Sequence, residues 1–299
     1  MRQRQFGNAM LDIEQIKQEI CDIGDRLYKR GFAAANDGNI SYRIGENEVL
    51  CTPTMICKGF MKPSDIATVD LEGNQLAGEK RRSSEALLHL EILKARPDVK
   101  SVVHCHPPHA TAFAVAREAI PSCVLPEVDV FLGNVPIARY ETPGGKEFAE
   151  TVLPFTAQAN VMILASHGVV SYGESVERAY WLTEILDAYC RILILAKQVG
   201  GVEFLSEQQG WELLALKKRF GIDDPRHDDS YTGADIFADD IFRETWAESG
   251  VNTGAFGIPA WSRAATDWPQ RSGGPFDVEA LIERIADRVA SKLREAPKG

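Results

Sequence analysis

The amino-acid sequence predicts an α/β protein whose core ends near Gly221. Two apolar, β-branched segments at 100–106 and 161–165 are typical of buried strands, because a strand covered on both faces is apolar almost throughout. A predicted helix follows each of them, starting near Pro108 and covering 175–198. This alternation of strands and helices indicates an α/β core.

The first predicted helix covers residues 13–27, where four isoleucines and Leu27 recur three or four positions apart and therefore share one face. Gly31 follows at the position where helices commonly end. Three short strand-like segments, separated by turn residues, come next at 40–43, 48–52 and 66–70.

The second half of the core alternates helices with the two buried strands. A helix is predicted at 84–95, before the strand at 100–106. The long helix at 175–198 directs one apolar face inward, formed by Ala179, Leu182, Leu186, Tyr189 and Leu193.

The composition changes after the core. Asp, Gly, Ser and Pro accumulate at 223–275, which predicts an extended linker or wrap-around arm. The last segment, 276–299, is periodic again and carries an apolar face of Val278, Leu281, Ile282, Ile285, Val289 and Leu293. We therefore divide the chain into a domain at 1–222, an arm at 223–275 and an amphipathic helix at 276–299.

Charge and composition exclude several classes of partner. The formal net charge is -10, which opposes non-specific binding to nucleic acid or to an anionic membrane. Apolar runs such as 192–196 are far shorter than the roughly 20 residues of a membrane-spanning helix. No export signal is recognisable, and the six cysteines form no CxxC pair, so we expect reduced thiols and a cytoplasmic protein.

Three histidines form a candidate metal site. His104 and His106 are two apart on a predicted strand, so both side chains leave the same face, while Cys105 points to the other. His167 follows the second buried strand and adds a third imidazole, which leaves a coordination position open for substrate. The alternative is a pair of histidines hydrogen-bonded at a strand end. His109 begins the next helix, and we expect a structural role for it.

Five motifs in order resemble the class II aldolase/adducin family over residues 12–200: GNIS at 38–41, TPT at 52–54, SSE at 83–85, VVHCH at 102–106 and SHG at 166–168. Within that family, the motifs resemble those of L-fuculose-phosphate aldolase and its relatives. The resemblance implies a mixed central β-sheet flanked by helices and a homotetramer with active sites between subunits.

The resemblance also implies the site and the reaction. His104, His106 and His167 would bind zinc or another divalent metal, and Glu85 would move the proton. The residues matching a phosphate site are Gly38, Asn39, Thr54, Ser83 and Ser84. The implied reaction is cleavage of a ketose 1-phosphate, of the L-fuculose or rhamnulose type, to dihydroxyacetone phosphate and lactaldehyde in fucose and rhamnose catabolism. For Glu85 the alternative is a carboxylate that only stabilises a helix N-terminus.

Two departures from the family pattern bear on specificity. Met55 follows TPT where relatives carry glycine, and its side chain penalises a positive φ angle. Leu125 matches the tyrosine that donates a proton to the aldehyde oxygen in fuculose-phosphate aldolase. Related decarboxylases and a sugar-phosphate 4-epimerase are therefore alternatives. A non-catalytic adducin-like interaction protein is a further alternative, which the retention of the three histidines opposes.

The terminal segment suggests a separate function. Residues 275–285 resemble the encapsulation peptides that carry enzymes into bacterial microcompartments. If this resemblance holds, Phe276 to Ala296 would bind a microcompartment shell protein, and the enzyme would lie inside the compartment. The alternative is that the helix packs on the enzyme itself.

Overall fold

The computed structural model of the protein describes residues 12–227, 250–252 and 255–257. The predicted terminal helix at 276–299, with its encapsulation motif, and most of the predicted arm at 223–275 lie outside the described residues.

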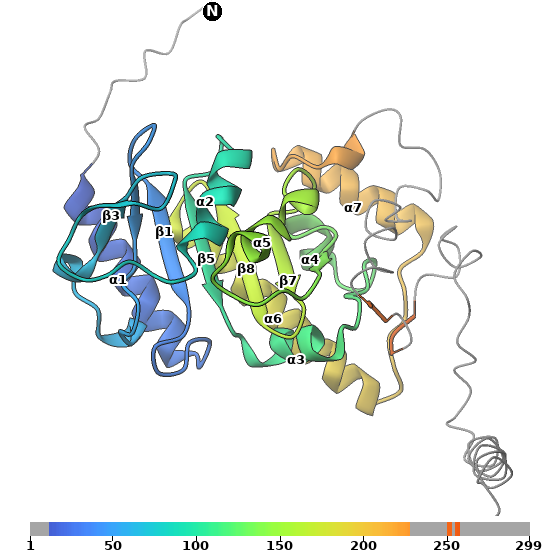
Figure 1. Cartoon of the computed structure of the whole chain (residues 1–299). Coiled ribbons are helices and arrows are strands. Elements are labelled where there is room, and N and C mark those ends of the chain that lie inside the picture. Colours follow the sequence, from blue (N-terminus) through green and yellow to red (C-terminus); the bar gives the residue numbers. More distant parts are fainter. Residues whose placement is uncertain (1–11, 228–249, 253–254, 258–299) are drawn as a thin grey trace, which may run out of the picture. The chain divides into compact units, whose positions relative to one another are not determined.

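One mixed sheet forms the centre of the described domain (Figure 1). Its strands are β1 (Asn39–Arg43), β2 (Val49–Cys51), β3 (Ala67–Val69), β4 (Gln75–Ala77), β5 (Ser101–Cys105), β6 (Ile137–Ala138), β7 (Val161–Leu164) and β8 (Gly168–Gly173). They lie in the order β4-β3-β2-β1-β5-β8-β7-β6, and every neighbouring pair is antiparallel except β6 with β7. The expected mixed sheet is confirmed.

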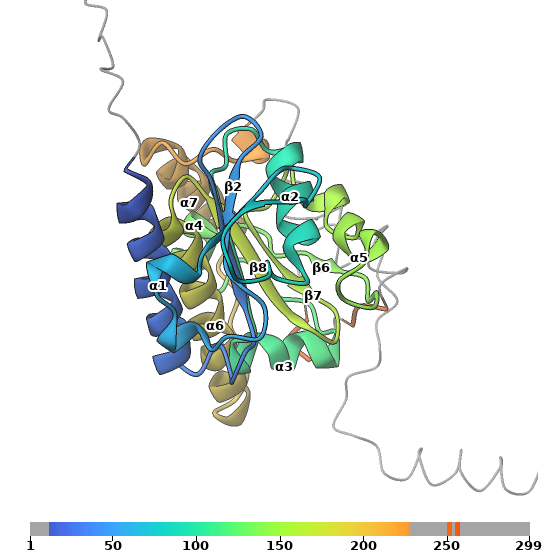
Figure 2. The ribbon, with the colours of Figure 1, turned by 60° about the vertical axis from the view of Figure 1, so that its left-hand side comes forward.

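Helices cover both faces of this sheet. The α-helices are α1 (Ile13–Lys29), α2 (Ala86–Ala95), α3 (Pro108–Ala116), α4 (Pro126–Phe131), α5 (Lys146–Glu150), α6 (Val176–Gln198) and α7 (Glu207–Arg219). Short 3-10 helices are η1 (Lys58–Phe60), η2 (Pro63–Asp65), η3 (Leu153–Phe155) and η4 (Pro225–His227). Figure 2 shows α1 and α6 on one side of the sheet and α2 and α5 on the other.

The two long helices follow from their sequences. In α1, the Asp12 side chain accepts the Gln15 N–H, and Gly31 after the helix adopts a φ of +71°. Ser175 caps α6 in the same way by accepting the Arg178 N–H. The predicted inward face of α6 is confirmed, because all five of its residues are buried: Ala179, Leu182, Leu186, Tyr189 and Leu193.

The structure corrects the start of the helix predicted at 84–95. The helix begins at Ala86, because the Ser83 hydroxyl accepts the Glu85 N–H and the chain turns before the first helical residue. The strands β4, β6 and β8 and the helices α4, α5 and α7 were not predicted. Of these, β8 matters most for the site, since it lies between the two predicted buried strands β5 and β7.

The described parts of the predicted arm contact the domain. Asp224 forms buried ion pairs with Lys217 of α7 and with Arg226. Asn252 exchanges backbone hydrogen bonds with Arg117 and Ala119, just after α3. The six cysteines are free thiols, and no helix among the described residues is long and apolar enough to cross a membrane.

Candidate active site

The three predicted histidines meet at one end of the central strands. His104 lies on β5, His106 one residue beyond it, and His167 in the turn between β7 and β8. Antiparallel pairing of β5 with β8 aligns Cys105 with Val169, so the end of β5 lies beside the start of β8. The ring centroids are 4.8–5.0 Å apart, and one nitrogen of each ring lies within 4.8 Å of the others.

Hydrogen bonds orient the rings. His104 Nδ1 lies 2.9 Å from the Val169 carbonyl oxygen, which can only accept, so Nδ1 carries the proton and Nε2 presents a lone pair. His104 Nε2 and His106 Nε2 are 3.2 Å apart. On its other side, His106 Nδ1 faces the Asp37 carboxylate at 3.4 Å. A carboxylate or carbonyl behind a ligating imidazole is the usual arrangement in metal sites.

Burial keeps two of the imidazoles neutral. It lowers the pKa of His104 well below 6.5, with further lowering by His106 and His167, and it lowers the pKa of His167 to about 4. Neutral imidazole nitrogens that converge in a partly enclosed space are suitable ligands for a divalent transition metal. The residues present therefore fit the metal that the sequence implies.

Two glycines make room for the histidines. A Cβ at Gly168 would lie 2.5 Å from His106 Cδ2 and 2.6 Å from the Cys105 carbonyl oxygen. Gly38 has a φ of +74°, and a Cβ there would lie 3.0 Å from the His104 carbonyl oxygen. The glycines of the SHG and GNIS motifs are therefore explained by close packing around the histidines.

Glu85 lies beside the same cluster. Its Oε1 is 3.3 Å from His167 Nε2, and its Oε2 is 3.4 Å from His104 Nε2. Asn39 Nδ2 donates a hydrogen bond of 3.0 Å to Oε2. Burial raises the pKa of Glu85, although the Asn39 hydrogen bond opposes the shift. Glu85 is the N-cap residue of α2 but makes no side-chain capping hydrogen bond, so its carboxylate faces the histidines instead.

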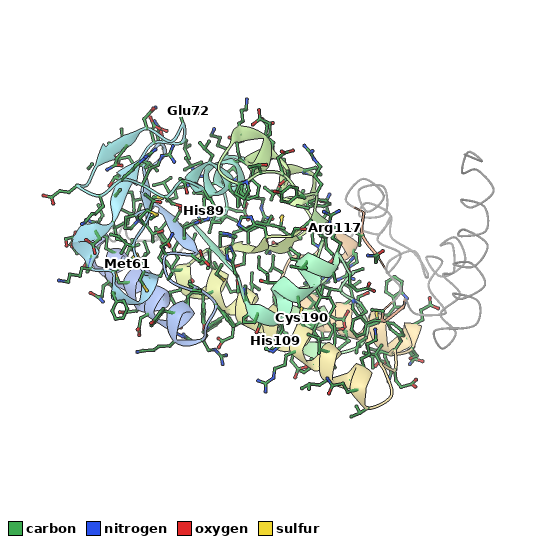
Figure 3. All side chains as sticks on the ribbon, turned by 60° about the horizontal axis from the view of Figure 1, so that its bottom comes forward. Met61, Glu72, His89, His109, Arg117 and Cys190 are labelled. Carbon is green, nitrogen blue, oxygen red and sulfur yellow. The ribbon has the colours of Figure 1, made fainter. Side chains whose placement is uncertain are left out.

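A second contact joins β1 to α2 one turn further along the helix. His89 of α2 projects toward the sheet, and its Nδ1 lies 2.8 Å from the Ser41 hydroxyl of β1 (Figure 3). His89 is fully buried, and burial lowers its pKa to about 3, so the imidazole stays neutral. This pair was not predicted from the sequence, although Ser41 belongs to the GNIS motif.

The residues matching a phosphate site lie on adjoining segments. The Thr54 N–H donates to the Arg81 carbonyl, and the Ser83 N–H donates to the Thr52 carbonyl, each at 3.0 Å. The Thr52 hydroxyl in turn accepts the N–H of Ile40, next to Asn39. Gly38, Asn39 and Ser83 are buried, Thr54 is partly buried and Ser84 is exposed.

Met55 adopts the backbone conformation that its side chain penalises. Its φ is +57°, and its side chain is exposed, with a relative accessibility of 76%. The turn after TPT therefore keeps a glycine-like backbone, and the substitution adds a side chain at the surface without abolishing the turn.

Other sequence predictions concern residues near the site. Cys105 is buried in the cluster that includes Ile20 and Ile40, on the opposite face from His104, as predicted. His109 at the start of α3 (Figure 3) pairs with Asp187 of α6, whose carboxylate also accepts the His109 N–H. Leu125 precedes α4 and is partly buried.

Two charged residues close to the site could not be recognised from sequence motifs. Asp37 lies behind His106, and Lys58 is buried beneath the segments that carry Asn39 and Thr54. Asp37 directly precedes GNIS, and proximity to the motif was the one available signal.

Comparisons with known proteins match residues 18–194 to the family described as Class II Aldolase and Adducin N-terminal domain. The chain is 31% identical over 186 residues to 3-oxo-tetronate 4-phosphate decarboxylase of Escherichia coli (strain K12), covering 61% of this chain and 87% of that protein. It is 34% identical over 175 residues to L-fuculose phosphate aldolase of Methanococcus vannielii, covering 58% and 93%. A solved structure named L-fuculose 1-phosphate aldolase has a TM-score of 0.64 and 27% identity, covering 72% of this chain and all of that one.

Proposed function

Since the chain belongs to the class II aldolase and adducin family, we propose that it is a zinc-dependent lyase that cleaves a carbon–carbon bond of a phosphorylated sugar. The observation that supports this proposal best is the convergence of His104, His106 and His167 beside Glu85. The proposed substrate is a ketose 1-phosphate of the L-fuculose or rhamnulose type, and the products are dihydroxyacetone phosphate and lactaldehyde.

The three histidines would hold the metal through the nitrogens that face one another, and Val169 and Asp37 would fix the rings from behind. Bound there, a zinc ion would supply positive charge next to the substrate carbonyl oxygen. Three protein ligands leave a position for substrate, and a fully closed shell of ligands would instead indicate a structural site.

Glu85 would move the proton. When the carbon–carbon bond breaks, its electron pair stays on the fragment that keeps the carbonyl and the phosphate, and that carbon must then gain a proton. Burial raises the pKa of Glu85, so the carboxyl group holds a proton nearer to neutral pH than an exposed glutamate does. The Asn39 hydrogen bond fixes the carboxyl oxygen that faces His104.

The phosphate would lie against Gly38, Asn39, Thr54, Ser83 and Ser84. Hydroxyl groups, an amide and the N-terminus of α2 are suitable donors for an anion. The backbone hydrogen bonds between residues 52–54 and 81–83 hold these donors together.

Decarboxylation of a phosphorylated 3-oxo sugar acid is a second candidate, and Leu125 favours it. Aldol cleavage requires a group that takes the hydroxyl proton of the departing aldehyde, whereas carbon dioxide leaves without any proton transfer. Leu125 stands where the family aldolase carries its tyrosine, and a hydrocarbon side chain cannot exchange a proton. The similarity to 3-oxo-tetronate 4-phosphate decarboxylase also supports decarboxylation.

One screen tests both candidates. The zinc-loaded protein is incubated with L-fuculose 1-phosphate, L-rhamnulose 1-phosphate and 3-oxo-tetronate 4-phosphate, while aldehyde and carbon dioxide are measured in parallel, with and without a chelator. Chelator-sensitive aldehyde release supports the aldolase, and chelator-sensitive carbon dioxide release supports the decarboxylase. A protein that purifies without stoichiometric metal and releases neither product would refute both, as expected of an adducin-like module.

A further inference from the structure

Lys58 is a buried lysine that touches two loops of the site. It lies on η1, with a relative accessibility of 1%. Its Nζ donates to the carbonyl of Asn36 at 3.0 Å and to the carbonyl of Ile56 at 2.7 Å. Asn36 belongs to the loop at 30–38 that leads into Asn39, and Ile56 belongs to the loop at 52–57 that carries Thr54.

We propose that Lys58 is a positioning residue for the phosphate group, because it ties these two loops together and places a fixed positive charge behind them. This proposal rests on the function proposed above. It adds a residue that the ordered motifs do not contain, and it assigns a source of local positive charge in a chain whose formal net charge is -10.

The environment of this ammonium group is unusual. Among the residues that the structure describes, no carboxylate oxygen lies within the 4.0 Å that defines an ion pair with Lys58. A buried cation without a paired anion is costly, and carbonyl dipoles compensate for the lost water only in part. Burial accordingly lowers the pKa of Lys58 to about 8, although Asp37 and Glu85 oppose the shift through their charges. An anion bound on the far side of the loops would relieve this cost.

Close packing fixes the position of η1 against α1. A Cβ on Gly24 of α1 would lie 2.7 Å from the Lys58 carbonyl oxygen, and a Cβ on Gly59 would lie 2.6 Å from the Tyr28 ring. Both glycines are therefore needed for η1 to approach α1 this closely. From η1 the Lys58 side chain extends to the two loops, where its ammonium group ends between them.

The loops meet again at their outer surface. The side-chain amide of Asn36 donates to Met55 Sδ at 3.7 Å, and Met55 itself holds the left-handed turn. Removal of the ammonium would remove the two hydrogen bonds, to the carbonyls of Asn36 and Ile56, by which Lys58 joins the loops. The metal ligands arise from β5 and from the β7–β8 turn, outside the two tied loops, although Asp37 behind His106 lies on one of these loops. We therefore expect zinc binding to be retained.

Lys58→Met tests the proposal, and Lys58→Arg is the matched control that keeps the charge. Each holoenzyme is characterised by zinc content, by the Kd for inorganic phosphate from calorimetry, and by kcat and KM with the sugar phosphate that the wild type cleaves. We expect Lys58→Met to weaken phosphate binding and to raise KM by about tenfold or more, as for the loss of a charged hydrogen-bond partner, with zinc content unchanged and kcat altered less than KM. Lys58→Arg should recover most of the loss.

Unchanged phosphate affinity in Lys58→Met would overturn the proposal, and so would a wild type that binds no phosphate. A fall in kcat alone, with KM and phosphate affinity preserved, would also contradict it. If Lys58→Met does not fold, Lys58→Gln carries the same prediction. The phosphate titration separates this proposal from the proposed function, because it decides the role of Lys58 even when none of the sugar phosphates is cleaved.

Discussion

Gly168→Ala is expected to weaken metal binding although it replaces none of the proposed metal ligands. The new Cβ would lie 2.5 Å from His106 Cδ2, which is about 0.9 Å short of the 3.4 Å at which ordinary contacts begin. The second obstacle, the Cys105 carbonyl oxygen at 2.6 Å, belongs to the backbone of β5 and cannot turn away. The His106 ring must therefore move, whereas metal–ligand distances tolerate only about 0.2 Å.

The size of the effect follows from that displacement. Disturbing a group that orients a ligand typically costs about 10- to 100-fold in metal affinity, which corresponds to about 1.4–2.8 kcal/mol. The overlap should also lower the unfolding free energy by about 1–3 kcal/mol, as for other overpacked sites. Zinc affinity is measured by competition with a chromogenic chelator, and stability by thermal unfolding of the metal-free protein.

Gly173→Ala is the matched control on the same strand. Its Cβ would lie 3.1 Å from Arg178 Cγ, in a flexible side chain that can give way. We expect zinc affinity within about threefold of the wild type for this variant, since remote surface substitutions rarely exceed about 0.5 kcal/mol. If Gly168→Ala binds zinc as tightly as the wild type, the steric explanation of the SHG motif is wrong.

Three further predictions concern chemistry, backbone strain and pH. Glu85→Gln should keep zinc but lose about 10²- to 10⁴-fold in turnover, while His106→Ala should lose both zinc and turnover; full activity of Glu85→Gln would remove its assigned role. Met55→Gly should change the unfolding free energy by less than about 1 kcal/mol, because relief of the left-handed strain offsets the greater freedom of the unfolded chain, whereas Met55→Val should destabilise by about 1–2 kcal/mol in denaturant unfolding. Asp224→Asn should lower the unfolding free energy by about 3–5 kcal/mol at neutral pH, since it removes the carboxylate charge that the buried Lys217 and Arg226 side chains contact. Burial disfavours the Asp224 carboxylate, but Arg226 and Lys217 hold its pKa below the ordinary 3.8. The stabilisation by this carboxylate is therefore present above pH 3.8 and should be lost as the pH falls below it. Unfolding curves of the Asp224→Asn variant should lack this acid-dependent loss.

The sequence predicted the fold best where a residue pattern is compatible with only one kind of secondary structure. The buried strands at 100–106 and 161–165 were predictable because continuous β-branched runs fit few other structures, and they correspond to β5 and β7. The strand between them, β8, was missed because it starts and ends with glycine and begins one residue after His167. The SHG motif overlaps the first residue of β8 and drew attention away from the apolar pattern of the strand. The strand β6 has only two residues, too few to form a pattern.

The same limit applies to the site. The sequence predicted that three histidines and Glu85 belong together, because ordered motifs carry that information. It gave no sign of Lys58, because the hydrogen bonds of this residue go to backbone carbonyls, which have no sequence signature. The conformation of Met55 was also beyond sequence reasoning, since propensity opposes the positive φ that the surrounding turn imposes.

The GNIS motif on β1 and the SSE motif before α2 are joined by hydrogen bonds, because the residue spacing of the strand and that of the helix place the bonding side chains opposite one another. Asn39 and Ser41 are two apart on β1 and therefore share a face. Glu85, the N-cap residue of α2, precedes His89 by four positions and lies on the same side of the helix. The two resulting hydrogen bonds, Asn39 to Glu85 and His89 to Ser41, join helix and strand at two points. Together with the buried apolar residues of α2, such as Leu88 and Ile92, these two bonds hold the angle of the helix and hence the place of the Glu85 carboxylate. The position of the proposed proton carrier is therefore set partly by His89, a neutral and fully buried histidine.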